Sequence, residues 1–348
     1  MADPDDRLVT TEPLTLAIET SCDETAAAVV RGRDVLANII ASQADLHTPY
    51  GGVVPEVAAR HHLGTVNAVV DEALATAGVR LKDVELFAVT QRPGLIGALL
   101  IGVATAKALA YAMERPLAMV DHLHGHICAA WLNPIALEPP FVSLVASGGH
   151  TRLDLVRDMR QPQLLGQTRD DAAGEAIDKG ARLLGLGYPG GPALERLAAG
   201  GNATAFAFPI GLRGAAERDF SYAGVKTALL YKVREIGDDL DAHRADLAAS
   251  YQAAVMRPLA DRLIAAARDH GVPAVAIGGG VASNGALRAL ISERADANGL
   301  TVAFPDRALC TDNAAMIGAA AQFTDVTPWP DFLAVDAIAT SPPGGIAA

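Results

Sequence analysis

The sequence is poor in cysteine, and the three cysteines that it has lie far apart. Cys22, Cys128 and Cys310 are odd in number and form no Cys-x-x-Cys pair. This pattern argues against a disulfide framework and fits a reducing compartment. The chain also begins Met-Ala-Asp-Pro-Asp-Asp, which is acidic where a secretion signal would be basic and then apolar. We therefore expect a cytoplasmic protein.

Long apolar runs and an excess of positive charge are missing as well. No stretch of roughly 18 or more uninterrupted apolar residues occurs, so we expect no membrane contact. The 348 residues, of which 51% are hydrophobic, are enough for two domains and a sizeable core. The net charge of −12 repels nucleic acid when it is spread evenly. An RNA substrate would therefore need a local basic patch or the surface of a partner.

Two histidines four residues apart are the most informative local feature of the chain. His122 and His126 would share one face of a helix, where two imidazoles can bind one divalent metal, and His124 would point to the opposite face. Helix-capping or core-edge histidines are the alternative interpretation. Zinc peptidases use the same spacing, but they carry a glutamate as general base next to the first histidine, where this chain has Leu123.

A third metal ligand has to come from elsewhere in the chain. The best candidate is Asp312, at the mouth of an apolar helix that is rich in small residues. Aspartate at such a position is also a common helix N-cap. Both roles are compatible, because a carboxylate at the start of a helix can also face a cleft.

Strands and helices alternate with short glycine-rich turns, which is the pattern of an α/β protein. Residues 14–31 predict a strand, a polar turn over residues 20–25, and a second strand. Residues 141–157 repeat that design around a turn at residues 147–151. Since each hairpin opens one half of the chain, we expect two domains of like topology. Each would begin with a turn whose backbone N–H groups can cradle an anion.

Two further glycine-rich turns follow expected strands and precede expected helices. One is at residues 93–97, and the other is at residues 278–280 and continues into Ser283-Asn284-Gly285. Strand, glycine turn and helix together are how nucleotides are held, although glycine also serves close packing. Asn284 adds a side chain for a ribose or a base.

An acidic segment lies between these turns. Asp171, Glu175 and Asp178 fall on one face of an expected helix. A solvated acidic face is the usual explanation. The intervening residues are nearly all small or apolar, however, so we expect a packed helix whose carboxylates face a cleft. Residues 188–192 then predict a rigid turn that could close over a ligand.

These motifs together resemble the bacterial TsaD family of tRNA N6-adenosine threonylcarbamoyltransferases, relatives of the archaeal and eukaryotic Kae and OSGEP proteins. The resemblance runs from about Leu14 to Gln322. It rests on eight motifs in the order of the family: residues 18–25, 50–56, His122 with His126, residues 147–151, 170–179, 219–221, 278–284 and 310–316.

The resemblance implies an α/β protein with the ASKHA fold, the actin-like ATPase architecture of two like-topology domains around a central cleft. This agrees with the repeated hairpins. We expect a flexible N-terminus over residues 1–13, a subdomain with the metal-binding histidines over 14–140, a subdomain with the substrate pocket over 141–324, and a tail over 325–348.

The resemblance also implies the ligands and their residues. One divalent metal per subunit, iron or alternatively zinc, would be held by His122, His126 and Asp312. An adenylate or ATP-type nucleotide would occupy the cleft. Ser147, Gly148 and Gly149 would cradle the substrate and its oxyanion, and no catalytic acid or base is assigned. The full set of implied substrate contacts is Ser147, Gly148, Gly149, His150, Thr151, Asp178, Gly191 and Asn284.

The implied reaction is a transfer of threonylcarbamoyl from threonylcarbamoyl-adenylate to tRNA. The acceptor would be the N6 amine of the adenosine 3′ of the anticodon, in tRNAs that read codons beginning with A. Partner proteins of the TsaB and TsaE types are expected. The two alternatives are an ATP-dependent phosphotransferase of the sugar-kinase type, which the same fold supports, and a metallopeptidase. Nothing in the sequence specifies a sugar.

One motif departs from the pattern of the family. Gln91 and Arg92 stand before Pro-Gly-Leu, where the family usually has a small residue and glycine. Arg92 would either point to solvent or narrow the cleft near the pocket.

Two groups of cations are candidates for tRNA contacts. Because phosphate binding needs several cations on one face, the alternative is scattered surface charge that Glu217, Asp219 and Glu235 neutralise. The first group surrounds residues 219–221 and the second lies in the N-terminal half: Arg213, Arg218, Lys226, Lys232 and Arg234, then Arg60, His61 and His62.

Overall fold

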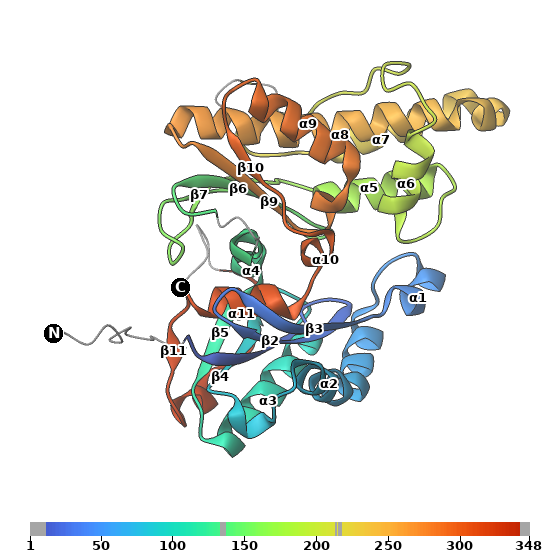
Figure 1. The fold of residues 1–348 in the computed structure, drawn as a ribbon. Coiled ribbons are helices and arrows are strands. Elements are labelled where there is room, and N and C mark those ends of the chain that lie inside the picture. The colour runs from blue at the N-terminus through green and yellow to red at the C-terminus, as the bar shows by residue number, and fades with distance from the viewer. Residues whose placement is uncertain (1–11, 133–136, 213, 215–217, 342–348) are drawn as a thin grey trace.

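Two mixed β-sheets with helices around and between them form the fold (Figure 1). The computed structural model describes residues 12–132, 137–212, 214 and 218–341. The predicted flexible N-terminus lies almost entirely outside these residues.

Six strands form the first sheet: β1 (Leu14–Glu19), β2 (Glu24–Arg31), β3 (Asp34–Ser42), β4 (Leu86–Arg92), β5 (Leu117–Asp121) and β11 (Val326–Thr327). Their order is β11-β5-β4-β1-β2-β3. β1 and β2 form the predicted antiparallel hairpin, and β3 pairs antiparallel with β2. β4 pairs parallel with β1, and β5 pairs parallel with β4.

Five strands form the second sheet: β6 (Phe141–Ala146), β7 (Thr151–Val156), β8 (Gln163–Gln167), β9 (Ala274–Gly278) and β10 (Thr301–Ala303). Their order is β10-β9-β6-β7-β8. The first three strands are again antiparallel, and the last two again follow in parallel. The second sheet therefore repeats the topology of the first, as the two hairpins predict.

The helices cover both sheets. Those of the first half are α1 (Ala44–His47), α2 (Pro55–Ala77), α3 (Ile96–Met113) and α4 (His122–Cys128). Those of the second half are α5 (Ala173–Leu183), α6 (Gly190–Ala198), α7 (Ala223–Ile236), α8 (Leu240–His270), α9 (Gly285–Asp296), α10 (Arg307–Cys310) and α11 (Ala314–Ala321).

The alternation of side chains along β1 shows how the layers pack. Leu16 and Ile18 join a core cluster with residues of α2 and α3. Ala17, between them, faces the other way and joins a cluster that contains α4, α11 and residues of the second sheet such as Val145. α4 and α11 therefore lie between the two sheets, as Figure 1 also shows.

The chain returns to the first sheet near its end. α11 packs on β1 and β2, β11 pairs with β5, and Phe332 is buried in the core beneath α3. The predicted division placed residues up to 324 in the second subdomain and the rest in a tail. We propose instead that residues 314–341 form one structural unit, the first unit, with the first sheet and the helices of the first half of the chain.

α3 is long and apolar enough, by length and composition alone, to cross a membrane. In this fold it packs on β4 and α2. The ammonium of Lys107, within the helix, donates to the carbonyl of Leu333 at 3.1 Å. These contacts are those of a helix that belongs to the first unit.

We predict that Gly180→Ala destabilises the fold. A Cβ at Gly180 of α5 would lie 2.2 Å from the ring of Tyr251, which is buried in α8 and donates a hydrogen bond to the carbonyl of Ala176. Overpacking of this kind lowers the free energy of unfolding by about 1–3 kcal/mol. Urea denaturation measures the change.

The matched control is Gly64→Ala in α2, where a Cβ would meet open space. Its free energy of unfolding should stay equal or rise, because alanine favours a helix over glycine. Equal stability of both variants would contradict the prediction.

Candidate metal centre

Two histidines and one aspartate converge between the sheets. α4 starts directly after β5, so His122 and His126 lie on one face of a helix, as their spacing predicts. Nε2 of His122 lies 3.5 Å from Oδ1 of Asp312, and Nε2 of His126 lies 3.2 Å from the same oxygen. The three ligand atoms lie within 4.8 Å of one another. Two imidazole nitrogens and one carboxylate oxygen form a suitable donor set for a divalent transition metal.

The surroundings of the triad favour a cation. Burial lowers the pKa of His122, but Asp312 and Glu19 outweigh this effect and raise the pKa to about 9. Burial opposes ionisation of Asp312, but His122 and His126 outweigh it and hold the pKa of Asp312 well below its usual range. Among the described residues, Nδ1 of buried His126 makes no hydrogen bond, and Nε2 approaches Oδ1 of Asp312. Since this Nε2 and this Oδ1 are both suitable metal ligands, a cation bound by them would satisfy the buried Nε2.

Asn313, rather than Asp312, caps α11. The Oδ1 atom of Asn313 accepts a hydrogen bond from the N–H of Met316 at 3.0 Å. The expectation that Asp312 caps this helix is therefore wrong. One residue ahead of the cap, the carboxylate of Asp312 faces the histidines instead.

The opposite side of α4 is tied into the core. Nε2 of His124 lies 2.7 Å from the carbonyl of Met159, which agrees with the expectation that His124 points away from the pair. Asp121 caps α4, since its Oδ1 accepts the N–H of Leu123 at 2.9 Å. Its Oδ2 lies 3.3 Å from Nε of Arg92. Arg92 therefore does not point to solvent; its guanidinium lies beside the carboxylate that caps α4.

The turn between β6 and β7 presents two backbone donors. The N–H of Ser147 donates to the carbonyl of His150 at 2.8 Å, and the N–H of His150 donates to Oγ of Ser147 at 3.1 Å. Gly148 and Gly149 are exposed, and no hydrogen bond to their N–H groups occurs in the described part of the chain. Among the residues expected to cradle an anion, these two glycines thus have backbone donors available.

The same turn borders the metal centre. The ring centroids of His150 and His122 lie 6.5 Å apart. Burial, together with the nearby histidines, lowers the pKa of His150 to about 4, so this imidazole is neutral near pH 7. Oγ1 of Thr151 accepts the N–H of Ala173 at 2.8 Å, which ties the turn to the start of α5.

Asp178 and Gly191 lie together where α6 begins. Oδ1 of Asp178 accepts the N–H of Gly190 at 2.8 Å, and the N–H of Gly191 also donates to this carboxylate. Burial raises the pKa of Asp178 despite these bonds. The turn before α6 is thus held by α5.

The prediction that Asp171 shares one helix face with Glu175 and Asp178 is wrong. α5 begins at Ala173, and the carboxylate of Asp171 pairs with Lys179 at 2.9 Å and with Lys226 at 2.5 Å. Glu175 pairs with Lys179 at 2.7 Å. Of the three carboxylates, Asp178 is the one without a lysine partner among the described residues.

Asn284 caps α9 and lies in the wall between α8 and α9. Its Oδ1 accepts the N–H of Leu287 at 3.1 Å, and its Nδ2 donates to Oε1 of Gln252 at 3.2 Å. The Asn284 side chain is buried. One N–H of the amide remains for a ligand, since an amide nitrogen carries two.

The triple-glycine turn after β9 serves close packing. A Cβ at Gly278 would lie 2.6 Å from the carbonyl oxygen of His126, and one at Gly279 would lie 2.3 Å from that of Ala146. Gly279 also has a φ of 87°, which favours glycine. Close packing, rather than nucleotide binding, therefore explains Gly278 and Gly279. Packing does not explain Gly280, where a Cβ would meet open space.

The comparison with known proteins identifies the family. Residues 34–319 match the family model described as TsaD: tRNA N6-adenosine threonylcarbamoyltransferase. The chain belongs to the TsaD family.

Individual TsaD relatives cover most of the chain. A tRNA N6-adenosine threonylcarbamoyltransferase of Cyanothece sp. is 54% identical over 311 residues, which are 88% of this chain and 90% of that protein. One of Clostridium perfringens is 52% identical over 310 residues, which are 88% and 91% of the two chains.

Solved structures bear on the fold. HypF of T. kodakarensis superposes with a TM-score of 0.63 at 17% identity, over 90% of this chain and 48% of that one. Component A of (R)-2-hydroxyglutaryl-CoA dehydratase of Acidaminococcus fermentans has a TM-score of 0.50 at 16% identity, over 90% and 96%. These likenesses concern the fold alone, and together with the family they confirm the predicted ASKHA architecture.

Two glutamates flank the turn after β1, and the sequence predicts no role for either of them. Burial, together with Asp312 and Asp23, raises the pKa of Glu24 to about 10, so Glu24 is protonated near neutrality. Glu19 is fully buried and contacts His122. The segment was noted as a strand and a polar turn. An available signal was a glutamate at the end of an otherwise apolar strand.

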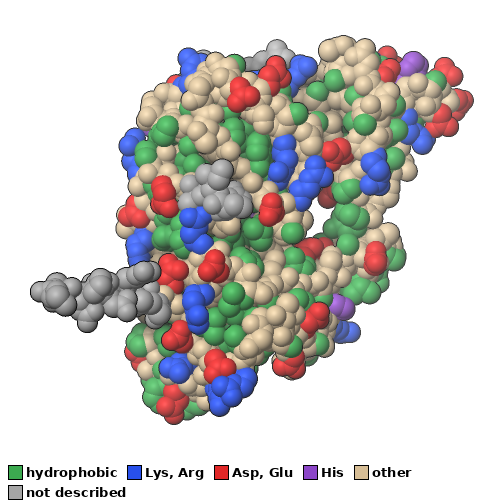
Figure 2. Space-filling view, viewed as in Figure 1, with side chains coloured by type: hydrophobic (Ala, Val, Ile, Leu, Met, Phe, Trp, Pro, Cys, Tyr) green, Lys and Arg blue, Asp and Glu red, His purple; other side chains and the backbone are tan. Residues whose placement is uncertain are grey.

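Three of the cations proposed for tRNA contact have acidic partners. Lys226 pairs with Asp171, Lys232 pairs with Glu235, and Arg218 pairs with Asp269. His62 is buried against Thr25 and belongs to no surface patch. Arg213 lies outside the described residues. Figure 2 shows positive and negative side chains interspersed on the face that it displays.

We predict that His126→Ala removes the metal. The substitution takes away one of three ligand atoms and leaves His122 and Asp312 without the partner that closes the triad. Metal analysis of the purified protein should find less than one tenth of the wild-type metal content, and transfer activity should fall with it. His124→Gln is the control, since His124 contacts Met159 and faces away from the triad. Full metal retention in His126→Ala would show that the triad is wrongly assigned.

Proposed function

We propose that this chain transfers threonylcarbamoyl from threonylcarbamoyl-adenylate to the N6 amine of the adenosine 3′ of the anticodon, in tRNAs that read codons beginning with A. One observation carries the proposal. In a chain that belongs to the TsaD family, the His122, His126 and Asp312 triad lies beside a glycine turn with two available N–H donors.

The reaction requires that the adenylate and the acceptor amine be oriented more than it requires a strong base. The adenylate is a mixed anhydride of a carbamic and a phosphoric acid and is already activated. The N6 amine attacks the carbamoyl carbon, the bond from that carbon to the phosphate oxygen breaks, and AMP leaves. Negative charge develops on the carbamoyl oxygen, and the N–H groups of Gly148 and Gly149 can receive it.

We propose that His122, His126 and Asp312 hold one divalent metal, either iron or zinc. When bound there, the metal supplies Lewis-acid polarisation of a carbamoyl or phosphate oxygen. The ring of His150 flanks that of His122 on the side of the turn, and burial together with Asp312 and Asp23 favours the uncharged form of Glu24.

We propose that the adenylate lies along the second unit. Asp178 would hold a ribose hydroxyl, and the remaining amide N–H of Asn284 would hold the adenine edge or the ribose. One observation supports this placement: Asp178 has no lysine partner among the described residues.

The two alternatives are less well supported by the geometry. A metallopeptidase needs a carboxylate base beside the metal, but Glu19 is engaged by His122 and Thr90, and Glu24 is protonated near neutrality. A sugar kinase shares the fold, but the relatives that cover 88% of the chain are named as threonylcarbamoyltransferases.

The function is tested by reconstitution with threonylcarbamoyl-adenylate and tRNA, followed by mass spectrometry of the nucleosides. We predict modified adenosine with the wild type and a KM for the adenylate raised at least tenfold in Asn284→Ser. Serine still caps α9 but lacks the amide donor. Hexose phosphorylation with ATP, in place of tRNA modification, would support the kinase alternative. An unchanged KM would move the nucleotide away from Asn284.

We propose three partners: tRNA, a protein of the TsaB type and a protein of the TsaE type. The proposal rests on the family and on the net charge of −12, which disfavours tRNA binding by this chain alone. A reducing cytoplasm would suit three unpaired cysteines, two of which are buried.

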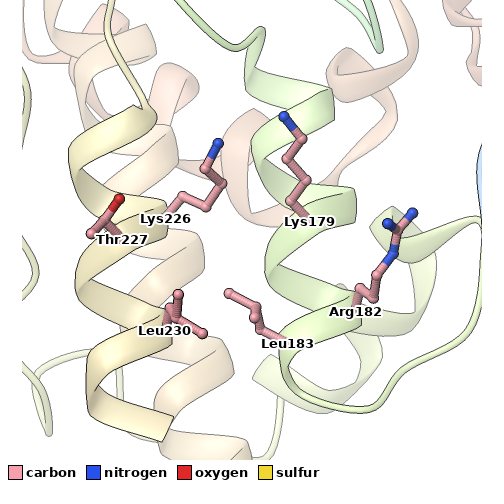
Figure 3. A pocket seen from close by; sticks show the side chains of 6 residues that line it. All are labelled: Lys179, Arg182, Leu183, Lys226, Thr227 and Leu230. Atoms are coloured by element: carbon pink, nitrogen blue, oxygen red, sulfur yellow. The ribbon is translucent and has the colours of Figure 1, made fainter. Parts of the chain in front are cut away.

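We propose that tRNA phosphates contact a pocket between α5 and α7. Lys179 and Arg182 from α5 and Lys226 from α7 line a space of about 300 Å³ (Figure 3). Two lysines meet the carboxylates of Asp171 and Glu175 here, and Arg182, which donates to the carbonyl of Gly51, adds a third cation. In an acidic protein, such a group of cations is where a phosphate would bind.

Lys226→Ala tests this pocket. Lys179 still neutralises Asp171 in the variant, so the change removes one cation without leaving a bare carboxylate. Filter binding of tRNA over a salt series, with the partner proteins present, should show a slope of log K against log salt that is smaller by about 1. Lys82→Ala, which removes an exposed lysine of the first unit, should leave the slope unchanged. Identical slopes for both variants would exclude the pocket.

A further inference from the structure

Glu19 is a buried carboxylate at the end of a core strand. It is the last residue of β1, and its side chain is fully inaccessible to solvent. A carboxylate in such a place is costly to bury unless hydrogen bonds compensate. Three donors do so: the backbone N–H of Ser21, the hydroxyl of Thr90 at 2.6 Å, and Nδ1 of His122 at 2.9 Å. Two of these donors belong to other segments of the chain.

The contact with His122 decides which nitrogen of that ring faces the metal site. When a metal displaces the second proton of the ring, an imidazole that donates its Nδ1–H to a carboxylate presents the lone pair on Nε2. Nε2 of His122 is the atom that lies 3.5 Å from Asp312. The hydrogen bond to Glu19 thus presents the nitrogen that the triad requires, in the arrangement by which carboxylates orient metal-binding histidines.

The second histidine has no such partner. Within the described residues, Nδ1 of His126 makes no hydrogen bond. Its ring meets that of His122 edge-on, with centroids 4.7 Å apart and an interplanar angle of 80°. The orientation of His126 therefore depends on Asp312 and on packing, and part of that packing is the ring that Glu19 holds.

We propose that Glu19 is the positioning residue of the metal centre, which sets the Nε2-binding tautomer of His122 and, through ring contact, the orientation of His126. The proposal rests on the His122, His126 and Asp312 triad of the proposed function. It adds a residue of β1 to the site. This positioning role differs from a purely structural one, in which Glu19 would only link β1 to β4 through Thr90.

Metal binding by the whole chain tests the proposal. The probe is Co²⁺ or Zn²⁺ alone, titrated against a chromophoric chelator, and the visible spectrum of bound Co²⁺ reports the ligand geometry. Glu19→Gln keeps an acceptor for Ser21 and a partner for Thr90 but removes the charge. We expect 10- to 100-fold weaker binding and an altered Co²⁺ spectrum.

Thr90→Val is the matched control, because it removes another hydrogen bond of the same carboxylate and leaves the contact with His122. It should bind metal within twofold of the wild type. The urea midpoint of each metal-free variant measures any effect on folding. If Glu19→Gln changed the midpoint while binding metal like the wild type, Glu19 would be structural and the proposal would be overturned.

Two measurements keep the test decisive. In the Zn²⁺-loaded wild type, histidine ¹⁵N shifts should show Nε2 ligation and a protonated Nδ1 at His122; ligation through Nδ1 would overturn the proposal even if Glu19→Gln failed to fold. Absence of stoichiometric metal in the wild type would instead overturn the triad and, with it, the role of Glu19. Metal binding that is lost in His126→Ala but unchanged in Glu19→Gln would retain the triad and reject the inference.

Discussion

The complete burial of α4 between two sheets is the constraint on which the rest of the site depends. Every residue of this helix is buried, and both sheets contribute to the core around it. Histidines on such a helix cannot be solvated, so each needs a polar or charged neighbour within the protein. Asp312, Glu19 and the hydroxyl of Ser21 are such neighbours for His122, and Asp312 is one for His126.

The same burial explains small residues at several distant positions. Gly278 allows β9 to end against the carbonyl of His126, and Gly125 allows α11 to approach α4, where a Cβ would lie 2.9 Å from the Ile317 side chain. The glycines at residues 278–280 indicated a nucleotide turn as much as a packing contact. Only the contacts between elements distinguish the two interpretations.

Local patterns predicted the architecture well. The two hairpins and the histidine pair were readable because strand periodicity, a polar turn and four-residue spacing lie within short windows. Local rules failed where two neighbouring residues compete for one role. Asn313 caps the helix in place of Asp312, and α5 starts too late to include Asp171. Residue propensities do not locate the start of a helix to within one or two residues, so they could not predict these differences.

The roles of Glu19 and Arg92 could not be predicted, because they depend on partners far away in the chain. Thr90 lies 71 residues from Glu19 and His122 lies 103 residues from it. Arg92 meets Asp121 across β4 and β5. No spacing within a motif indicates such contacts. They follow only from the parallel pairing that places the carboxyl ends of β1, β4 and β5 side by side.

The late return of the chain to the first sheet has a consequence for synthesis. α11 is wholly buried and covers the face of β1 and β2 that carries Ala17, Ala28 and Val30. Until residue 321 has left the ribosome, this face lacks its cover, and the nascent first sheet exposes apolar surface while the second unit is being made. Sequential folding of one finished domain after the other is therefore unavailable to this chain. The first unit completes its core only when the last tenth of the polypeptide arrives, and Asp312 reaches the two histidines in the same step.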